Sequence, residues 1–282
     1  MEEEEEVKDF SSNRIGLHGL IQIHEKLKLN YFLKYLYLPL QDLGDQGAMI
    51  VADILKSSSC LLVLNLSSNR ICFKGAIAIA EALSENQKLA LLNIDNNNIQ
   101  DQGCKVILES LQKNKTLKWL NMNFNEINNI VTPIPPNLQS LFLCQNKLIC
   151  FPFFLENLRV LDISWNKLHA EGIKDLCMNL RNNYSILELN IKNNTQNAKL
   201  SPHSIDISKL IERNLLIHKH WVQKMILFIP IFDSFHHHLF RIIFASSVIL
   251  IPRSKPAPLF PSTFMKNHRL VTKKRANSTF NF

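Results

Sequence analysis

The chain has 282 residues and a formal net charge of +8, and 46% of its residues are apolar. This length and composition allow a substantial core and exclude a chain that is disordered throughout. The charge is uneven, because residues 214–282 carry ten Lys and Arg residues against one acid, which leaves −1 for residues 1–213. The basic balance therefore belongs to the C-terminal segment, and we expect no nucleic-acid partner for the rest.

The first ten residues, MEEEEEVKDF, are acidic and contain no apolar stretch of the kind that starts a secretory signal. We therefore expect a cytoplasmic protein, with delivery into another cell as an open alternative. The six cysteines are irregularly spaced and form no CxxC pair, which argues against a disulfide framework and against a zinc site. We expect no metal and no cofactor.

A pattern of leucines followed by an asparagine recurs along the chain. Residues 61–71, LLVLNLSSNRI, set leucines at spacings of three and two before Asn69. The same spacing appears 28 residues earlier and twice more at steps of 28, and then at steps of 21, 20 and 28. At residues 10–15 only part of it is present. This predicts a partial, capping repeat in residues 1–30 and full repeats over residues 31–200.

The longer repeats contain a second pattern after the asparagine. Gly75, Ala76, Ile79, Ala80 and Leu83 have the i, i+3, i+4, i+7 spacing of one helix face, and similar sets begin at three other glycines, Gly47, Gly103 and Gly172. Each long repeat is therefore predicted to be a short strand with inward leucines, a turn and an amphipathic helix. In the two short repeats prolines replace the helix, which predicts extended or 3₁₀ segments there: Pro133, Pro135, Pro136 and Pro152.

Neighbouring strands lie about 4.8 Å apart, whereas packed helices need about 8 to 10 Å, so stacked repeats of this kind must bend. We therefore predict an α/β solenoid, a horseshoe with a parallel inner sheet and outer helices. The pattern over residues 10–196 resembles that of leucine-rich repeat proteins. The long repeats resemble the ribonuclease-inhibitor-like class, and residues 134–148, IPPNLQSLFLCQNKL, resemble the shorter repeats of bacterial effectors.

The recurring asparagine stands where the chain leaves the sheet and turns, at a place where backbone groups need partners. A buried amide side chain can both donate and accept hydrogen bonds there, so a structural role is expected. The residues of this predicted ladder are Asn69, Asn97, Asn125, Asn146, Asn166 and Asn194.

The outward positions of the inner sheet are the expected recognition surface, because they are regularly spaced and free of core duties. Trp and Tyr side chains dominate interface hot spots. The valines, leucines and asparagines in the same rows are also explained by strand preference and by the repeat itself. The residues that we expect to contact a partner are Tyr35, Tyr37, Trp119, Asn121, Phe142, Asp162 and Glu188.

Residues 201–222 are predicted to form a C-terminal capping helix whose inner face carries Ile207, Leu210, Ile211 and Leu215. Residues 223–282 are apolar and basic, but prolines and charges interrupt the apolar stretches, so none is long enough to span a membrane. This tail is expected to be poorly structured, with an interfacial membrane anchor and a transport signal as open alternatives.

The resemblance implies a non-catalytic scaffold that binds a protein partner on the concave face of the solenoid, and we expect it to act as a monomer. The repeats show no nucleophile with a neighbouring base and no phosphate-binding loop, so no enzyme activity is expected. Two alternatives stay open. One is a regulator that activates small GTPases or acts like ribonuclease inhibitor, and the other is an adaptor that contacts a membrane through its tail.

Overall fold

The computed structural model describes residues 6–151, 155, 157–194 and 202–228. The chain divides into two compact units, Met1–Ile217 and His218–Phe282, and the first contains all the repeats. The predictions for the tail from residue 229 onward lie outside the described residues. No helix in the described part of the chain combines the length and the apolar character needed to cross a membrane.

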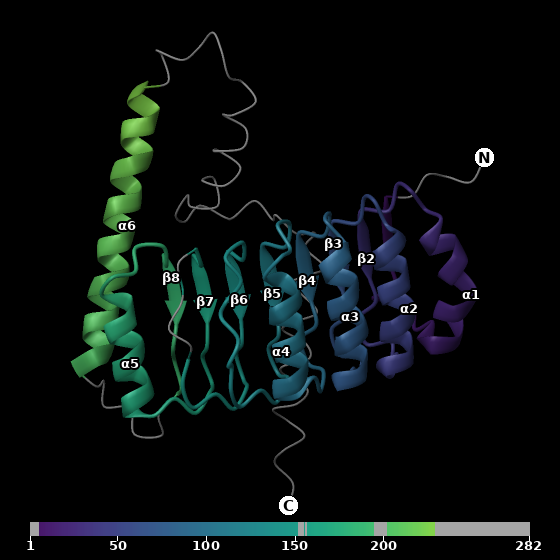
Figure 1. Ribbon diagram of the computed structural model, residues 1–282, viewed down its shortest axis with the longest axis horizontal. Helices are drawn as coiled ribbons and strands as arrows, with labels where there is room; N and C mark the ends of the chain where they lie inside the picture. The colour runs from purple at the N-terminus through teal and green to yellow at the C-terminus, as the bar shows by residue number, and fades with distance from the viewer. Residues whose placement is uncertain (1–5, 152–154, 156, 195–201, 229–282) are drawn as a thin grey trace, which may run out of the picture. The chain divides into compact units, whose positions relative to one another are not determined.

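Eight short strands form one parallel sheet in which every strand pairs with its neighbours in sequence (Figure 1). The sheet is open, with β1 and β8 as its edges. The pairing confirms the predicted strand positions, since Val63 pairs with Tyr35 and with Leu91. The strands are β1 Val7–Asp9, β2 Tyr35–Tyr37, β3 Val63–Asn65, β4 Leu91–Asn93, β5 Trp119–Asn121, β6 Ser140–Phe142, β7 Val160–Asp162 and β8 Glu188–Asn190.

The first strand, β1, was not evident from the leucine pattern, because Lys8 occupies the position at which the next strand has Leu36. Its backbone still pairs in parallel with β2, and α1 follows it. The first repeat therefore has a strand and a helix, and a polar residue replaces the leucine on the outermost side of the stack. An edge strand without the central leucine suits a position where no further coil covers it.

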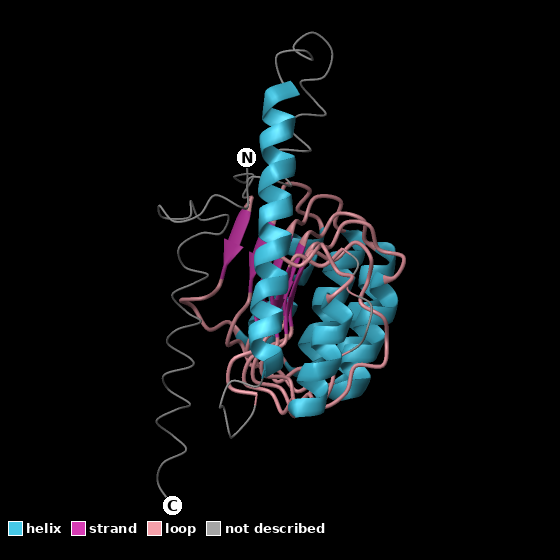
Figure 2. Cartoon of the chain, turned by 90° about the vertical axis from the view of Figure 1, so that its left-hand side faces the viewer, coloured by secondary structure: helices cyan, strands magenta, loops and turns pink. Residues whose placement is uncertain are grey.

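Helices α1 to α5 lie on one side of the sheet (Figures 1 and 2). No helix joins β5 to β6, where three prolines stand, and none occurs among the described residues between β6 and β7. Both findings agree with the prediction for the short repeats. The helices are α1 Gly16–Lys28, α2 Gly44–Ser57, α3 Phe73–Glu85, α4 Gln100–Leu111, α5 Ala170–Leu180 and α6 Pro202–Phe228.

The core lies between the sheet and these helices. The predicted inner face of α3, which begins with Gly75, is buried, and so are the strand leucines Leu64 and Leu92 at 0% exposure. A Cβ added at Gly75 would lie 2.7 Å from Asp45 Oδ1 and 2.9 Å from Ala48 Cβ. The repeated glycine therefore lets successive helices approach more closely than a side chain would allow.

Helix α6 covers the C-terminal end of the stack through Ile207, which is buried, and through Leu210 and Ile211, which contact the core. The prediction for Leu215 is wrong, since that side chain is 43% exposed and Asn214 is buried instead. From Ile207 the i+7 position of an α-helix is residue 214. The helix also continues to Phe228, beyond its predicted end at residue 222.

We expect Leu92→Ala to lower the free energy of unfolding by about 3 kcal/mol, because it leaves a cavity in the centre of the sheet. Chemical denaturation followed by circular dichroism measures this change. Met49→Ala, at a side chain that is 48% exposed on α2, is the matched control and should change stability by less than about 0.5 kcal/mol. Equal effects of the two substitutions would contradict the placement of the core.

Candidate functional site

Two rows of side chains point to the side of the sheet opposite to α1–α5, and we call them the recognition face. The strand register puts residues of neighbouring strands side by side along each row. The first row is Val7, Tyr35, Val63, Leu91, Trp119, Ser140, Val160 and Glu188. The second row is Asp9, Tyr37, Asn65, Asn93, Asn121, Phe142, Asp162 and Asn190.

Two aromatic rings meet near the middle of the recognition face. Trp119 pairs with Ser140 and Asn121 pairs with Phe142, so Trp119 and Phe142 are diagonal neighbours on adjacent strands. Their ring centroids are 5.0 Å apart and the rings are tilted by 44°. This distance is within the favourable range for aromatic pairs. Both side chains are only partly buried, and neither belongs to the hydrophobic core.

The tyrosines of β2 differ in exposure. Tyr35 is half-buried, whereas Tyr37 is only 5% exposed, so the predicted outward presentation of Tyr37 is wrong. Its hydroxyl group has no hydrogen-bond partner among the described residues. Burial raises the pKa of Tyr37 to about 12, and the nearby Tyr35 and Asp9 add to the shift. Tyr37 therefore stays a protonated hydrogen-bond donor at any physiological pH.

Asn121, predicted to contact a partner, has a local structural contact instead. It is 3% exposed, and its Oδ1 accepts a hydrogen bond of 3.0 Å from the backbone N–H of Asn123. The same bond to the residue two positions later recurs along the second row and fixes the turn that ends each strand. The other residues of that row whose side-chain oxygen accepts it are Asp9, Asn65, Asn93, Asp162 and Asn190.

The two acidic residues predicted for the site lie on adjacent strands. Asp162 is half-buried, and its carboxylate accepts hydrogen bonds from the backbone N–H of Ser164 at 2.9 Å and from Asn190 Nδ2 at 3.0 Å. Glu188 is exposed at the start of β8. Neither carboxylate forms an ion pair with any residue that the structure describes. Their negative charges are therefore available to a partner.

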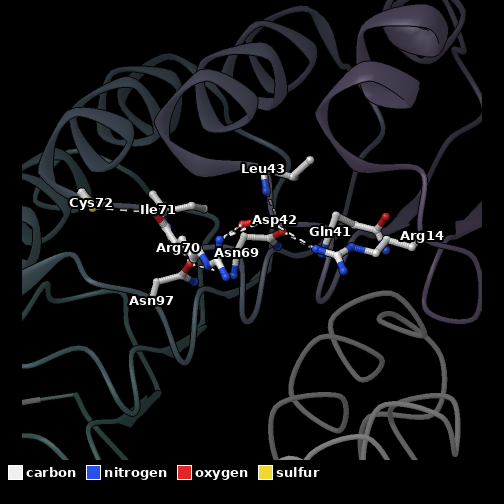
Figure 3. A network of polar contacts seen from close by, with 9 residues as sticks. All are labelled: Arg14, Gln41, Asp42, Leu43, Asn69, Arg70, Ile71, Cys72 and Asn97. Atoms are coloured by element: carbon white, nitrogen blue, oxygen red, sulfur yellow. Dashed lines mark hydrogen bonds and ion pairs between the residues drawn. The ribbon is translucent and has the colours of Figure 1, made fainter.

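The asparagines of the predicted ladder lie buried at the corner that follows each strand. Asn97 Oδ1 accepts bonds from the backbone N–H groups of Asn69 at 3.0 Å and Ile71 at 2.9 Å, and its Nδ2 donates to the oxygens of Leu66 and Ile94. Figure 3 shows the N-terminal part of this row, where Gln41 stands in the asparagine position. Each amide bridges one coil to the coil before it.

The other corner of each coil has a second ladder that the sequence analysis missed. Asn114 Nδ2 donates to the backbone oxygens of Leu83 and Asn86, both at 2.9 Å, and its Oδ1 accepts from Leu117 N–H at 2.8 Å. Asn86 makes the equivalent contacts one coil earlier. The signal was present, because Asn86 and Asn114 are separated by the same 28 residues as the leucines.

An acidic residue between two arginines joins three coils at the surface (Figure 3). Asp42 Oδ1 lies 2.9 Å from Arg70 Nη1, and Asp42 Oδ2 lies 3.3 Å from Arg14 Nη2. Both arginine side chains are mostly exposed. Exposed pairs of this kind contribute little to stability, and the arrangement contains no nucleophile or base for catalysis.

The cysteines have the surroundings of structural thiols. Cys104 and Cys177 are buried, as predicted from their helix positions. Burial raises the pKa of Cys104 to about 12 and that of Cys144 to about 11. Raised pKa values make thiols poor nucleophiles. Within the described ranges, no three His, Cys, Asp or Glu side chains are grouped as metal ligands.

The family described as Leucine Rich repeat matches residues 57–80, 85–108 and 155–177. These segments contain strands β3, β4 and β7 of the parallel sheet, with helical residues of α3, α4 and α5. The fold is a leucine-rich repeat solenoid. Its ribonuclease-inhibitor-like and effector-like subclasses are finer assignments that the match does not make.

Several solved structures are similar to this solenoid. The leiomodin-1 actin-binding site 2 has 15% identity and a TM-score of 0.38, over 73% of this chain and 95% of that one. The tropomodulin C-terminal domain of Caenorhabditis elegans has 12% identity and a TM-score of 0.40, over 73% and 98%. An internalin from Listeria monocytogenes has 18% identity and a TM-score of 0.44, over 64% and 54%. No curated protein matches the sequence.

We expect Asn97→Ala to destabilise the solenoid by about 3 kcal/mol, because it leaves buried N–H and C=O groups of two coils without partners. Urea denaturation measures the loss. Asn98→Ala, at the adjacent exposed position, is the control and should stay within about 0.5 kcal/mol of the wild type. A stable Asn97→Ala variant would show that the ladder is dispensable.

Thiol labelling tests the environments of the cysteines. In the native protein at pH 8, iodoacetamide should modify the exposed Cys150 and leave Cys104 unmodified, because Cys104 is buried and its pKa is about 12. Peptide mass spectrometry before and after unfolding in urea identifies the modified residues. Rapid modification of Cys104 in the folded protein would contradict its burial.

Proposed function

We propose that this solenoid is a non-catalytic scaffold that binds a protein partner on the recognition face. The observation that carries the proposal is the pair of partly exposed rings, Trp119 and Phe142, in contact on adjacent strands. The core does not need them, since the buried leucines of the same strands supply it. Large aromatic side chains on a surface are the residues that most often supply binding energy to an interface.

The rigidity of the backbone beneath the rings supports the same role. Each strand of the face is held by parallel pairing on both sides, except at the two edges. The turn after each strand is closed by a side-chain oxygen, and the corner beyond it by an asparagine amide, as at Asn121 and Asn146. A surface that is already ordered loses little conformational entropy when a partner binds.

The chemistry of the described residues supports a binding role rather than catalysis. The recognition face presents aromatic, aliphatic, amide and carboxylate groups, and none of its residues is a cysteine, histidine or lysine. Such a surface provides contacts and hydrogen bonds without an evident nucleophile. The helices of the long repeats and their absence between β5 and β6 also support a ribonuclease-inhibitor-like first half followed by shorter, effector-like repeats.

The experiment compares proteins captured by the full-length chain with those captured by Trp119→Ala/Phe142→Ala. We expect the double variant to lose at least one specific partner, because removal of central aromatic contacts typically costs about 2 kcal/mol or more per residue. Quantitative mass spectrometry of the bound fraction gives the readout. Met178→Ala on α5, at a side chain that is 48% exposed, is the control and should keep every partner.

The double variant must keep the circular dichroism spectrum and the unfolding midpoint of the wild type for this comparison to count. If both variants capture the same proteins in the same amounts, the recognition face is not the binding surface.

A further inference from the structure

The charged residues of the recognition face all have the same sign. Among the outward positions of β1–β8, the charged side chains are Asp9, Asp162 and Glu188, and no lysine or arginine occurs there. Lys8 is in the middle of β1 and takes the inward register of Leu36. The first 213 residues as a whole are nearly neutral, so the face is more acidic than the body that carries it.

The turn after each strand does not need these negative charges. At four positions of the second row an asparagine accepts the backbone bond that closes the turn, as Asn121 does from Asn123. Asp9 and Asp162 make the same bond, to Ser11 and Ser164, through one carboxylate oxygen. Since a neutral amide serves equally well, the carboxylates add charge beyond what the fold requires.

Both aspartates pair in register with an aromatic residue. Asp9 pairs with Tyr37 across β1 and β2, and Asp162 pairs with Phe142 across β6 and β7. The face of an aromatic ring attracts a cation, and a carboxylate next to it adds direct charge attraction. A cationic side chain that reaches either place therefore meets two favourable groups that lie on neighbouring strands.

Basic residues near the face stand at its margins, where they leave these charges uncompensated. Lys118 precedes β5, and its Nζ donates to the backbone oxygen of Lys115 at 3.0 Å. Arg159 precedes β7 and Lys192 follows β8. None of them forms an ion pair with Asp162 or Glu188, and among the described residues Asp9 has no ion pair either.

We propose that the recognition face binds a basic segment of a partner protein, in which a lysine or arginine lies beside an apolar residue. This inference rests on the proposed function and names the chemistry of the partner. The apolar residue covers the rings of Trp119 and Phe142, and the cationic group lies against Asp162 and Glu188 on the next two strands. The distance between the two subsites is set by the strand spacing, about 5 Å per strand.

The test selects ligands without assuming their sequence. Short random peptides displayed on phage are panned on the immobilised full-length protein, after peptides that also bind Trp119→Ala/Phe142→Ala have been removed. We expect the enriched peptides to be net positive and to contain lysine or arginine next to an aromatic or aliphatic residue. Enrichment of neutral or acidic peptides, or no enrichment, would overturn the inference.

The carboxylates are then tested with the most enriched peptide by fluorescence anisotropy. Asp162→Asn retains the oxygen that closes the turn and removes only the charge, so its unfolding midpoint should match the wild type while its affinity falls about fivefold. Glu188→Gln should act in the same direction, and high salt should reduce the difference. Glu171→Gln, a fully accessible acid on α5, is the control and should leave the affinity unchanged.

The outcomes separate this inference from the proposed function. If peptides depend on Trp119 and Phe142 but are insensitive to Asp162→Asn and to salt, the face binds protein and the basic character of the partner is wrong. If captured proteins and peptides are both insensitive to the two aromatic residues, the proposed function itself fails.

Discussion

Every coil of this solenoid has to turn twice while its backbone is buried, and each turn leaves N–H and C=O groups that water cannot reach. An unpaired group of this kind costs about as much as several favourable contacts supply. The chain meets the constraint with one amide side chain at each corner, such as Asn97 after the strand and Asn114 after the helix. Because each amide also binds the preceding coil, the same bonds that close the turns hold the stack together.

The regularity of the recognition face follows from this constraint. When identical amide bonds fix both corners, each strand must lie in the same register as its neighbour, and the outward side chains align into rows. The helices on the other side can then vary. Between β5 and β6 the helix is absent, yet Trp119 and Phe142 still meet across those two strands. Binding chemistry and packing are thus separated onto opposite sides of one sheet.

The sequence predicted the strands, the helices and the rows because period and spacing determine which side of an element a residue takes. It could not predict exposure, which depends on neighbours that lie far away in the chain. Tyr37 and Asn121 point to the predicted side and are nonetheless buried. The leucine pattern also drew attention away from Asn86 and Asn114, whose 28-residue separation carries the second corner. At α6 the error was one of phase, since an i+8 position was chosen where the helix buries i+7.

The turn that ends each strand accepts either an amide or a carboxylate at the same place, as Asn121 and Asp162 show. A lineage can therefore exchange one for the other by a single substitution while the architecture stays intact. Selection on such sites would change which partners are attracted and which are repelled, strand by strand. The scaffold thereby gains a palette of surface potentials that evolves independently of its foldability.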